Sequence, residues 1–416
     1  GVRGMRVLLD TEPLRHRPFR RLWATTAVTG IGSQLTAVAV PLQVYDLTGS
    51  SAYVGLADLA AFVPLVVSAL WGGALADVVD RRRILLATQT GMAVVSALFW
   101  AQAAVGARSV PVLLVLVAAQ QALFGAGAAV RGAVVPRVVP PELLPGANAL
   151  QSMVTWFGGI AGPLLAGTLV AVFGLPTLYL LDALAICAAL PAVRGLPDLP
   201  VTGGGGAGGR LGPGAVAEGL RYVVTRPALL VVYLADFTAM FFGMPAALFP
   251  QVAHQVFGDP ADGGIVIGVL SAAMSAGALL GACLSGTYSR IGRHGVMVTA
   301  AACCWGAAIA GFGLATSLPV AAVLLAVSGV ALLVLGVFRK TILHTAAEDR
   351  VRGRLQGIDT VVAAGGPLLA GLAHGTIAAT LGPTWAITGG GVLALLAMLA
   401  AVLAFPSFWA IGRTAP

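Results

Sequence analysis

Apolar stretches of about 20 residues recur along the whole chain, and a helix needs about that length to cross a hydrocarbon core of roughly 30 Å. The chain is 58% hydrophobic and 10% charged, whereas a soluble domain carries roughly a quarter charged residues. We therefore expect an all-α membrane protein. Its twelve predicted spans are 19–44, 53–76, 84–105, 110–130, 146–171, 175–193, 227–252, 264–287, 296–316, 319–338, 356–379 and 384–406.

Positive charge is distributed unevenly when the chain is threaded through these spans. Of the 24 Lys and Arg residues, only Arg108 falls on one of the two sides. The positive-inside rule then predicts that both termini lie in the cytoplasm. This topology explains the net charge of +8 without a nucleic-acid partner. No short apolar segment with a cleavage site follows the N-terminal arginines, so we expect no cleaved signal peptide.

The hexapeptide GPLLAG occurs twice, at 162–167 and 366–371, which are 204 residues apart (366 − 162). The copies fall in the fifth and eleventh predicted spans. Arg17-Pro18 and Arg226-Pro227 open the first and seventh spans with a similar offset. These matches indicate two pseudo-symmetric six-helix halves, related by an axis along the membrane normal. The expected domains are an N-terminal half at 1–193, a cytoplasmic Gly-rich linker with an amphipathic segment at 194–226, and a C-terminal half at 227–416.

The stretch GGALADVVDRRR, from Gly72 to Arg83, resembles a loop signature of the major facilitator superfamily, Gly-x-x-x-Asp-Arg-x-Gly-Arg-Arg. An acid at the end of a span can meet the positive N-terminus of a neighbouring helix and nearby guanidinium groups. The loop at 285–294 carries the complementary pattern. The resemblance implies a cytoplasmic latch between the halves, whereas a basic loop that only obeys the orientation rule is the alternative. The expected latch residues are Gly73, Asp77, Arg81, Arg82, Arg290, Gly292 and Arg293, with Val78 and Asp80 departing from the signature.

The fifth predicted span contains GGIAGPLLAG, which resembles the superfamily's exporter signature, Gly-x-x-x-Gly-Pro-x-x-Gly-Gly. Its residues are Gly158, Gly162, Pro163 and Gly167, with Ala166 as the one departure. Glycines four apart permit close helix packing, and a helix-interior proline removes one backbone hydrogen bond. Generic membrane packing also favours this spacing. The second copy contributes Gly366, Pro367 and Gly371 but lacks a match for Gly158.

Stretches at 41–56, 179–184, 241–250 and 352–358 resemble those of the enterobactin-exporter-like branch, which includes bacterial drug and siderophore effluxers. This resemblance implies the major facilitator fold and an exporter in the bacterial inner membrane. The expected partners are a small-molecule substrate, protons and the lipid bilayer, with no cofactor and a monomeric protein. One departure is Gln121, since the branch usually has an Arg four residues before the position of Gly125.

Four acids fall inside predicted spans, where ionisable groups are costly and usually functional. These proton-coupling candidates are Asp58, Asp182, Asp236 and Asp359. Asp236 lies about 13 Å into its span at 1.5 Å per residue, in a helix that lines the central cavity of the superfamily, and is the first choice. A structural role is the alternative for Asp236 and the preferred interpretation for Asp182. Asp58 is expected nearer the outer surface and Asp359 nearer the inner one.

Further candidates for the cavity wall are Gln34, Gln121 and Phe241. The leading hypothesis is a proton-coupled exporter of small amphiphilic molecules, such as a drug, antibiotic or siderophore, that works by alternating access. A lipid or lysophospholipid flippase on the same fold is the first alternative. A transporter-derived membrane enzyme or sensor is the second, although no nucleophile elbow, nucleotide loop or metal-ligand spacing supports it. We expect no metal site.

Overall fold

The computed structural model describes residues 11–76, 79–198, 213–288, 291–346 and 352–411. Within these ranges every regular element is a helix. The α-helices are α2 (Arg17–Thr48), α3 (Ser51–Ala76), α4 (Arg81–Ala104), α5 (Val110–Val138), α6 (Leu144–Phe173), α7 (Leu175–Arg194), α8 (Pro213–Val224), α9 (Pro227–Gly243), α10 (Phe249–Gln255), α11 (Ile265–Cys283), α12 (Ser285–Tyr288), α13 (His294–Leu314), α14 (Leu318–Ala346), α15 (Arg352–Leu381) and α16 (Pro383–Ala404). Short 3-10 helices are η1 (Glu12–Arg15), η2 (Pro141–Leu143), η3 (Ala246–Leu248) and η5 (Pro406–Ala410).

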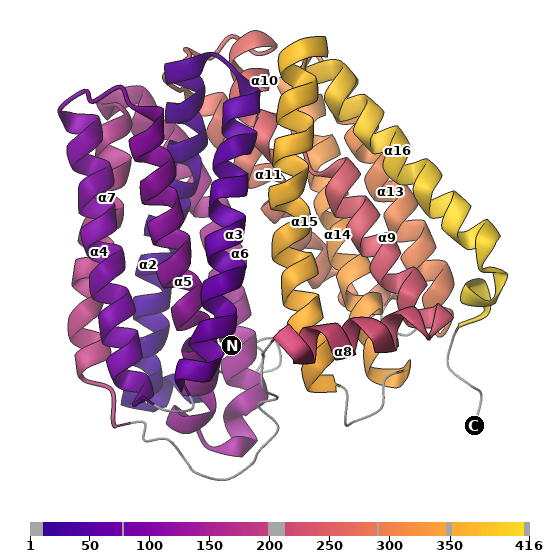
Figure 1. Cartoon of the computed structure of the whole chain (residues 1–416), viewed down its shortest axis with the longest axis horizontal. Coiled ribbons are helices and arrows are strands. Elements are labelled where there is room, and N and C mark those ends of the chain that lie inside the picture. Colours follow the sequence, from indigo (N-terminus) through magenta and orange to yellow (C-terminus); the bar gives the residue numbers. More distant parts are fainter. Residues whose placement is uncertain (1–10, 77–78, 199–212, 289–290, 347–351, 412–416) are drawn as a thin grey trace, which may run out of the picture.

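Eleven helical segments in the described ranges are long and apolar enough to cross a membrane, and they correspond to eleven of the twelve predicted spans. The remaining predicted span, 356–379, lies on α15, a helix of 30 residues. The side chains of residues 352–361 lie outside the described part of the chain. In Figure 1, α15 runs alongside the other long helices.

The seventh predicted span is interrupted rather than continuous. α9 ends at Gly243, η3 follows, and the α-helix resumes as α10. Met244 is extended, with φ −91° and ψ 106°, because the ring of Pro245 disfavours the helical conformation in the residue before it. The segment Pro227–Gln255 nevertheless remains one apolar crossing of 29 residues.

The long helices form two groups of similar make-up, α2 to α7 and α9 to α16 (Figure 1). The two groups meet mainly along two seams, where α3 packs on α15 and α6 packs on α11. Both groups contain the same tight turn, because α6 joins α7 through Gly174 and α15 joins α16 through Gly382. These glycines have φ of 84° and 91°, a left-handed conformation that other residues rarely adopt.

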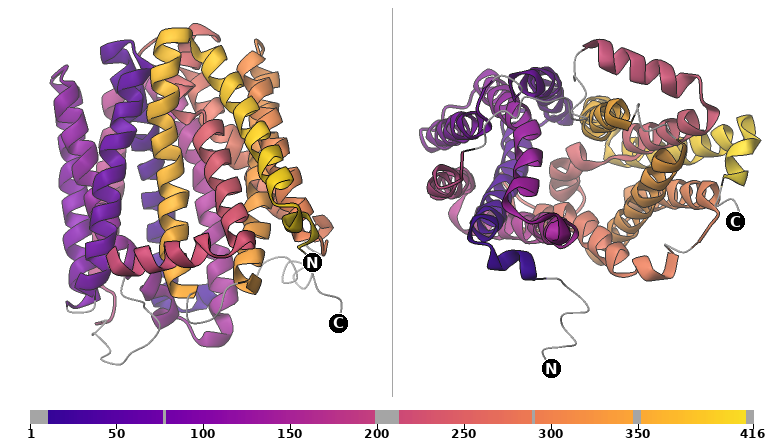
Figure 2. Two further views of the ribbon diagram at one scale, coloured as in Figure 1. Left: turned by 45° about the vertical axis from the view of Figure 1, so that its right-hand side comes forward. Right: turned by 90° about the horizontal axis from the view of Figure 1, so that it is seen from below.

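The two ends of the bundle differ in charge. We name as the basic end the one where α2, α4 and α9 begin and α7 ends, which carries Arg17, Arg82, Arg194 and Arg226. The other, distal end contains the connections at 105–109 and 256–264. Among the described residues of those connections, Arg108 is the one Lys or Arg. The helix α8 lies crosswise at the basic end, beside α15 and α9 (Figures 1 and 2).

Candidate functional site

The first copy of GPLLAG packs against two helices at once. A Cβ atom at Gly162 would collide with the side chain of Gln34 on α2, in the same half. A Cβ atom at Gly167 would lie 2.9 Å from the Cα of Gly268 on α11, in the other half. Gly158 is less crowded, since its nearest neighbour would be 3.9 Å away. The signature therefore permits close packing of α6 against a helix of its own half and also against α11 across one of the two seams.

The second copy makes the equivalent pair of contacts with the halves exchanged. A Cβ atom at Gly366 would lie 2.9 Å from the Cβ of Met240 on α9, in the same half. A Cβ atom at Gly371 would collide with the carboxylate of Asp58 on α3, across the seam. The helix prolines of the two copies, Pro163 and Pro367, both lie inside their helices. The repeated hexapeptide thus builds both seams.

Polar groups join the halves toward the distal end. The hydroxyl of Ser51 donates a hydrogen bond to Gln251 Oε1 (2.5 Å), and Gln255 Nε2 donates to the hydroxyl of Tyr45 (3.4 Å). Gly375 on α15 packs against the backbone of Ser51 so closely that a Cβ atom would collide with its carbonyl oxygen. In this structure the seams are therefore closed at the distal end.

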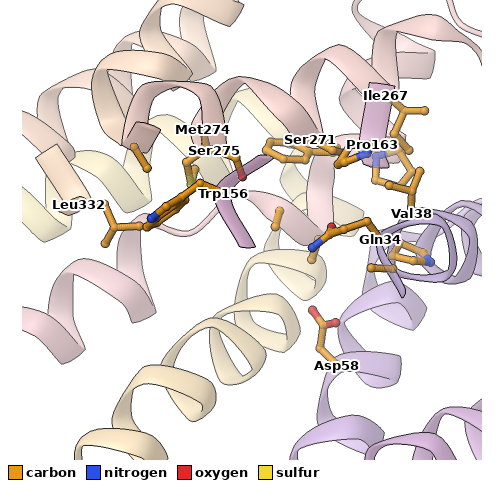
Figure 3. Close-up of a pocket in the computed structure, with 17 residues that line it drawn as sticks. Gln34, Val38, Asp58, Trp156, Pro163, Ile267, Ser271, Met274, Ser275 and Leu332 are labelled. Atoms are coloured by element: carbon orange, nitrogen blue, oxygen red, sulfur yellow. The ribbon is translucent and has the colours of Figure 1, made fainter. Parts of the chain in front are cut away.

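Two adjacent cavities lie between the helices next to these seams. The first has a volume of about 340 Å³ and lies between the two halves. The second has a volume of about 350 Å³ and extends among α2, α3, α4 and α5, with Leu368 of α15 also in its wall. They share four lining residues, Gln34, Ala37, Pro41 and Asp58. The rest of the first wall is largely apolar, and its larger side chains include Phe249 together with Trp156 and Met274 (Figure 3).

Asp58 is the one charged residue among those that line either cavity. Its side chain points from α3 into the first cavity in Figure 3. Among the described residues, none donates a hydrogen bond to its carboxylate and none forms an ion pair with it. Pro41 and Pro250 lie at matching places in the two halves, 209 residues apart (250 − 41). At this offset the counterpart of Asp58 is Ile267 (58 + 209), which lines the first cavity. The acid was expected near the outer surface, whereas the structure places it in the wall between the two cavities.

Asp236 forms an ion pair that the sequence did not reveal. Its Oδ2 accepts from Arg339 Nη1 at 2.8 Å, linking α9 to α14. The side chains are 7% and 8% exposed, respectively. Neither residue belongs to the walls of the two cavities.

Asp182 is completely buried in α7. Its Oδ2 accepts hydrogen bonds from the hydroxyls of Thr36 on α2 (2.6 Å) and Ser96 on α4 (3.2 Å). This arrangement ties three helices of the first half together. Asp359 lies on α15, but its side chain is outside the described part of the chain.

The predicted latch lies partly outside the described residues, which include neither Asp77 nor Arg290. Arg82 donates hydrogen bonds to Asp198 Oδ1 (2.9 Å) and to the carbonyl oxygen of Arg194 (2.6 Å). Arg194 is the last residue of α7, and Asp198 follows that helix. The departure at Asp80 has a local explanation, because its carboxylate caps α4 by accepting from the backbone N–H of Arg82 (3.0 Å). The other described latch residues are Gly73 within α3, Arg81 at the start of α4, and Gly292 and Arg293 just before α13. The latch stays a prediction.

Two of the three candidates for the cavity wall line a cavity, and the third does not. Gln34 lines both cavities and Gln121 lines the second. Phe241 lines neither of them, and its ring instead stacks on Phe237 with centroids 5.5 Å apart. Its carbonyl lies 3.1 Å from Nε2 of the buried His374.

Sequence reasoning missed the hydroxyl-bearing side of the first cavity. Ser271 and Ser275 on α11 line it, and their spacing of four residues places them on one helix face. That spacing, in a span otherwise composed of small and apolar residues, was the available signal. Within the described ranges, no cluster of three or more His, Cys, Asp or Glu residues could hold a metal ion.

Comparisons with known proteins agree with this architecture. Residues 10–410 match the family described as transmembrane secretion effector. The multidrug efflux pump Tap of Mycolicibacterium fortuitum is 29% identical over 82% of this chain and 84% of its own length. The enterobactin exporter EntS of Shigella boydii is 25% identical over 95% of this chain and 94% of its own length.

Solved structures share the fold at low identity. A crystal structure of the nucleoside transporter NupG superimposes with a TM-score of 0.70 at 13% identity, covering 96% of this chain and 100% of that one. A bacterial homologue of the human lysosomal transporter Spinster gives 0.66 at 16% identity, covering 97% and 98%. The predicted fold of two six-helix halves is thereby confirmed. These matches concern transporters rather than enzymes, and the chain belongs to the transmembrane secretion effector family of major facilitator superfamily exporters.

Proposed function

We propose that the protein is a proton-coupled exporter of small cationic, amphiphilic molecules, and that Asp58 binds the proton and the substrate in turn. The observation that carries this proposal is one carboxylate without a described partner, in the wall shared by two cavities and against the α3–α15 seam. Such a group is available to either ligand. Since one carboxylate cannot hold a proton and a cation at once, their competition couples the two movements.

The cavity walls support a substrate that is partly apolar. The two cavities have volumes of about 340 and 350 Å³. Each volume lies within the range of roughly 300–1,000 Å³ that is typical of pockets for drug-sized ligands. Trp156 and Phe249 provide aromatic surface, and Gln34 and Gln121 provide amides. The branch that this chain resembles usually carries an Arg at the position of Gln121. Because this chain has Gln121 in place of that Arg, no positive charge competes for Asp58 in the described cavity wall.

Asp236, the first choice from the sequence, is less suited to this role. A proton on its carboxylate would remove the negative charge that balances the buried Arg339 guanidinium. Breaking a buried pair in this way is strongly unfavourable. We therefore assign a structural function to the Asp236–Arg339 pair, and proton exchange to Asp58.

The charge distribution supports one orientation of the protein in the membrane. We take the basic end as cytoplasmic, with both termini there and the protein monomeric in the bacterial inner membrane. The closed distal end then faces outward, and substrate enters the cavities from the cytoplasm in this proposal. The printed names of the relatives Tap and EntS support export, although they transport chemically different cargo.

A ligand-stabilisation screen tests the substrate class, because a ligand that binds the folded state raises its apparent stability. The probes are ethidium as a planar cation, chloramphenicol as a neutral drug, and lysophosphatidylcholine. We expect ethidium to raise the melting temperature of the wild type but not of Asp58→Asn. The variant Asp262→Asn, which changes an exposed acid at the distal end, serves as the control and should behave as the wild type.

Two results would contradict the proposed substrate class. Equal stabilisation of wild type and Asp58→Asn by ethidium would separate the cation from this carboxylate. Stabilisation by lysophosphatidylcholine alone would favour a lipid flippase instead.

A further inference from the structure

A second carboxyl group lies deeper in the first half than the cavities. Asp182 has no exposed surface, and its two hydrogen-bond donors, Thr36 and Ser96, are neutral hydroxyls. Its other oxygen, Oδ1, is buried without a hydrogen-bond partner. The backbone of Gly32 leaves the space beside this atom, since a Cβ atom at Gly32 would lie 2.9 Å from Oδ1.

No cation on the helices packed against α7 reaches this carboxyl group within the described chain. Those helices are α2, α4 and α6. At 1.5 Å per residue, Arg21 lies about 22 Å along α2 from Thr36, and Arg83 lies about 20 Å along α4 from Ser96. The charged or titratable side chains on α2, α4, α6 and α7 are Arg17, Arg20, Arg21, Tyr45, Asp46, Arg81, Arg82, Arg83, Tyr179, Asp182, Cys187 and Arg194, of which α6 contributes none.

The two other titratable groups within the apolar part of α7, Tyr179 and Cys187, do not pair with the Asp182 carboxyl group. Tyr179 donates its hydroxyl hydrogen to Gln43 Oε1 at 2.7 Å, and Cys187 is exposed. An ionised carboxylate buried without a cation is unfavourable, and such a group takes up a proton instead. Protonation makes the carboxyl group neutral and so removes the charge that no cation balances, and Oδ2, which meets Thr36, is the atom at which the proton can arrive or leave.

Thr36 connects this group to the transport cavity. Its side chain lines the second cavity, and its hydroxyl donates to Asp182 at 2.6 Å. Because a hydroxyl can donate one hydrogen bond while it accepts another, it can pass a proton between the cavity and the carboxyl group. The same cavity wall contains Asp58.

From this geometry we infer that Asp182 is a second proton-binding site, neutral in this state, which exchanges its proton with the second cavity through Thr36. The use of this proton in transport rests on the proposed function. Protonation itself does not, because it can be measured in the resting protein. The site extends the cavity chemistry beyond the carboxylate that meets the substrate.

Infrared spectroscopy of the purified protein tests the inference, since a protonated carboxyl group has a carbonyl stretch that a carboxylate lacks. We expect a protonated-carboxyl band at neutral pH that is lost in Asp182→Asn and kept in Asp58→Asn. Transfer into D₂O should shift this band as the proton exchanges. Thr36→Val should change the band position and slow the exchange, whereas Thr36→Ser should restore both.

Thr88→Val is the matched control, because Thr88 is also buried in the first half but bonds only to carbonyls of its own helix, α4. It should leave the band and its exchange unchanged. A spectrum that is the same with and without Asp182 would overturn the inference. If Asp182→Asn does not fold, a band unaffected by Thr36→Val would do the same. Failure of ethidium to stabilise the wild type, with a band that is still lost in Asp182→Asn, would contradict the proposed function alone.

Discussion

At the scale of single residues, partners distinguish the three acids whose side chains the structure describes. Asp236 faces a guanidinium, Asp182 faces two hydroxyls, and Asp58 faces a cavity. All three are equally exceptional in the sequence, because each is an acid within an apolar span. Their different surroundings give them different expected roles in charge balance, proton storage and ligand exchange.

The ion pair should be a determinant of stability. Asp236→Asn leaves the buried Arg339 without this carboxylate, and breaking a buried pair costs about 3–5 kcal/mol. We expect a clear fall in the melting temperature in detergent, partly recovered in the double variant Asp236→Asn/Arg339→Gln.

The exposed pair Arg82–Asp198 provides a matched control. Its side chains are 31% and 78% exposed, and such pairs contribute about 0–1 kcal/mol. Asp198→Asn should therefore change the melting temperature very little. A similar loss in both single variants, or no recovery in the double variant, would contradict the assignment.

The sequence could identify which acids lie in the membrane, but not which partners they have. The ion pair joins residues 103 positions apart, and nothing local to Asp236 or Arg339 reveals their contact. The environment of Asp58 depends on the α3–α15 seam, which exists only after the halves have packed. Gln34 and Gln121 were found because amides stand out in apolar spans, whereas Phe241 resembles its many apolar neighbours and lines neither cavity.

At the scale of elements, the two copies of GPLLAG have the same structural task. Each places one glycine against a helix of its own half and another across a seam. The sequence predicted the duplicated halves from this repeat, because identical residues in equivalent helices make equivalent contacts. It did not predict the interruption between α9 and α10, where Pro245 overrides an apolar run that would otherwise continue as a helix.

Substitutions within the exporter signature should differ according to the neighbour of each glycine. In Gly167→Ala the new Cβ atom would press on the backbone of Gly268. Overpacking of this kind costs about 1–3 kcal/mol, so the closed distal seam should be disfavoured by roughly 5- to 150-fold. Probe export in proteoliposomes should fall accordingly.

Gly158→Ala is the control in the same motif, since its nearest neighbour would lie at 3.9 Å, an ordinary contact. Export should stay close to that of the wild type. Equal loss of export in the two variants would show that the spacing matters for helix packing in general and not for the seam.

At the scale of the whole molecule, the proposed orientation places the basic end in the cytoplasm and the closed distal end outside. With the native Cys187, Cys283, Cys303 and Cys304 replaced by alanine, single cysteines can report which end faces outward. Asp262→Cys, at the distal end, should react with a membrane-impermeant maleimide in intact cells. Asp198→Cys, at the basic end, should react only after permeabilisation, and the reverse pattern would contradict the orientation.

The most direct test of the account measures coupling through Asp58. In proteoliposomes with an imposed pH gradient, ethidium movement by the wild type should be accelerated by the gradient. Asp58→Asn should lose this response, while the double variant Asp236→Asn/Arg339→Gln should keep it. A gradient response that persists in Asp58→Asn, and disappears when the Asp236–Arg339 pair is removed, would contradict the central claim.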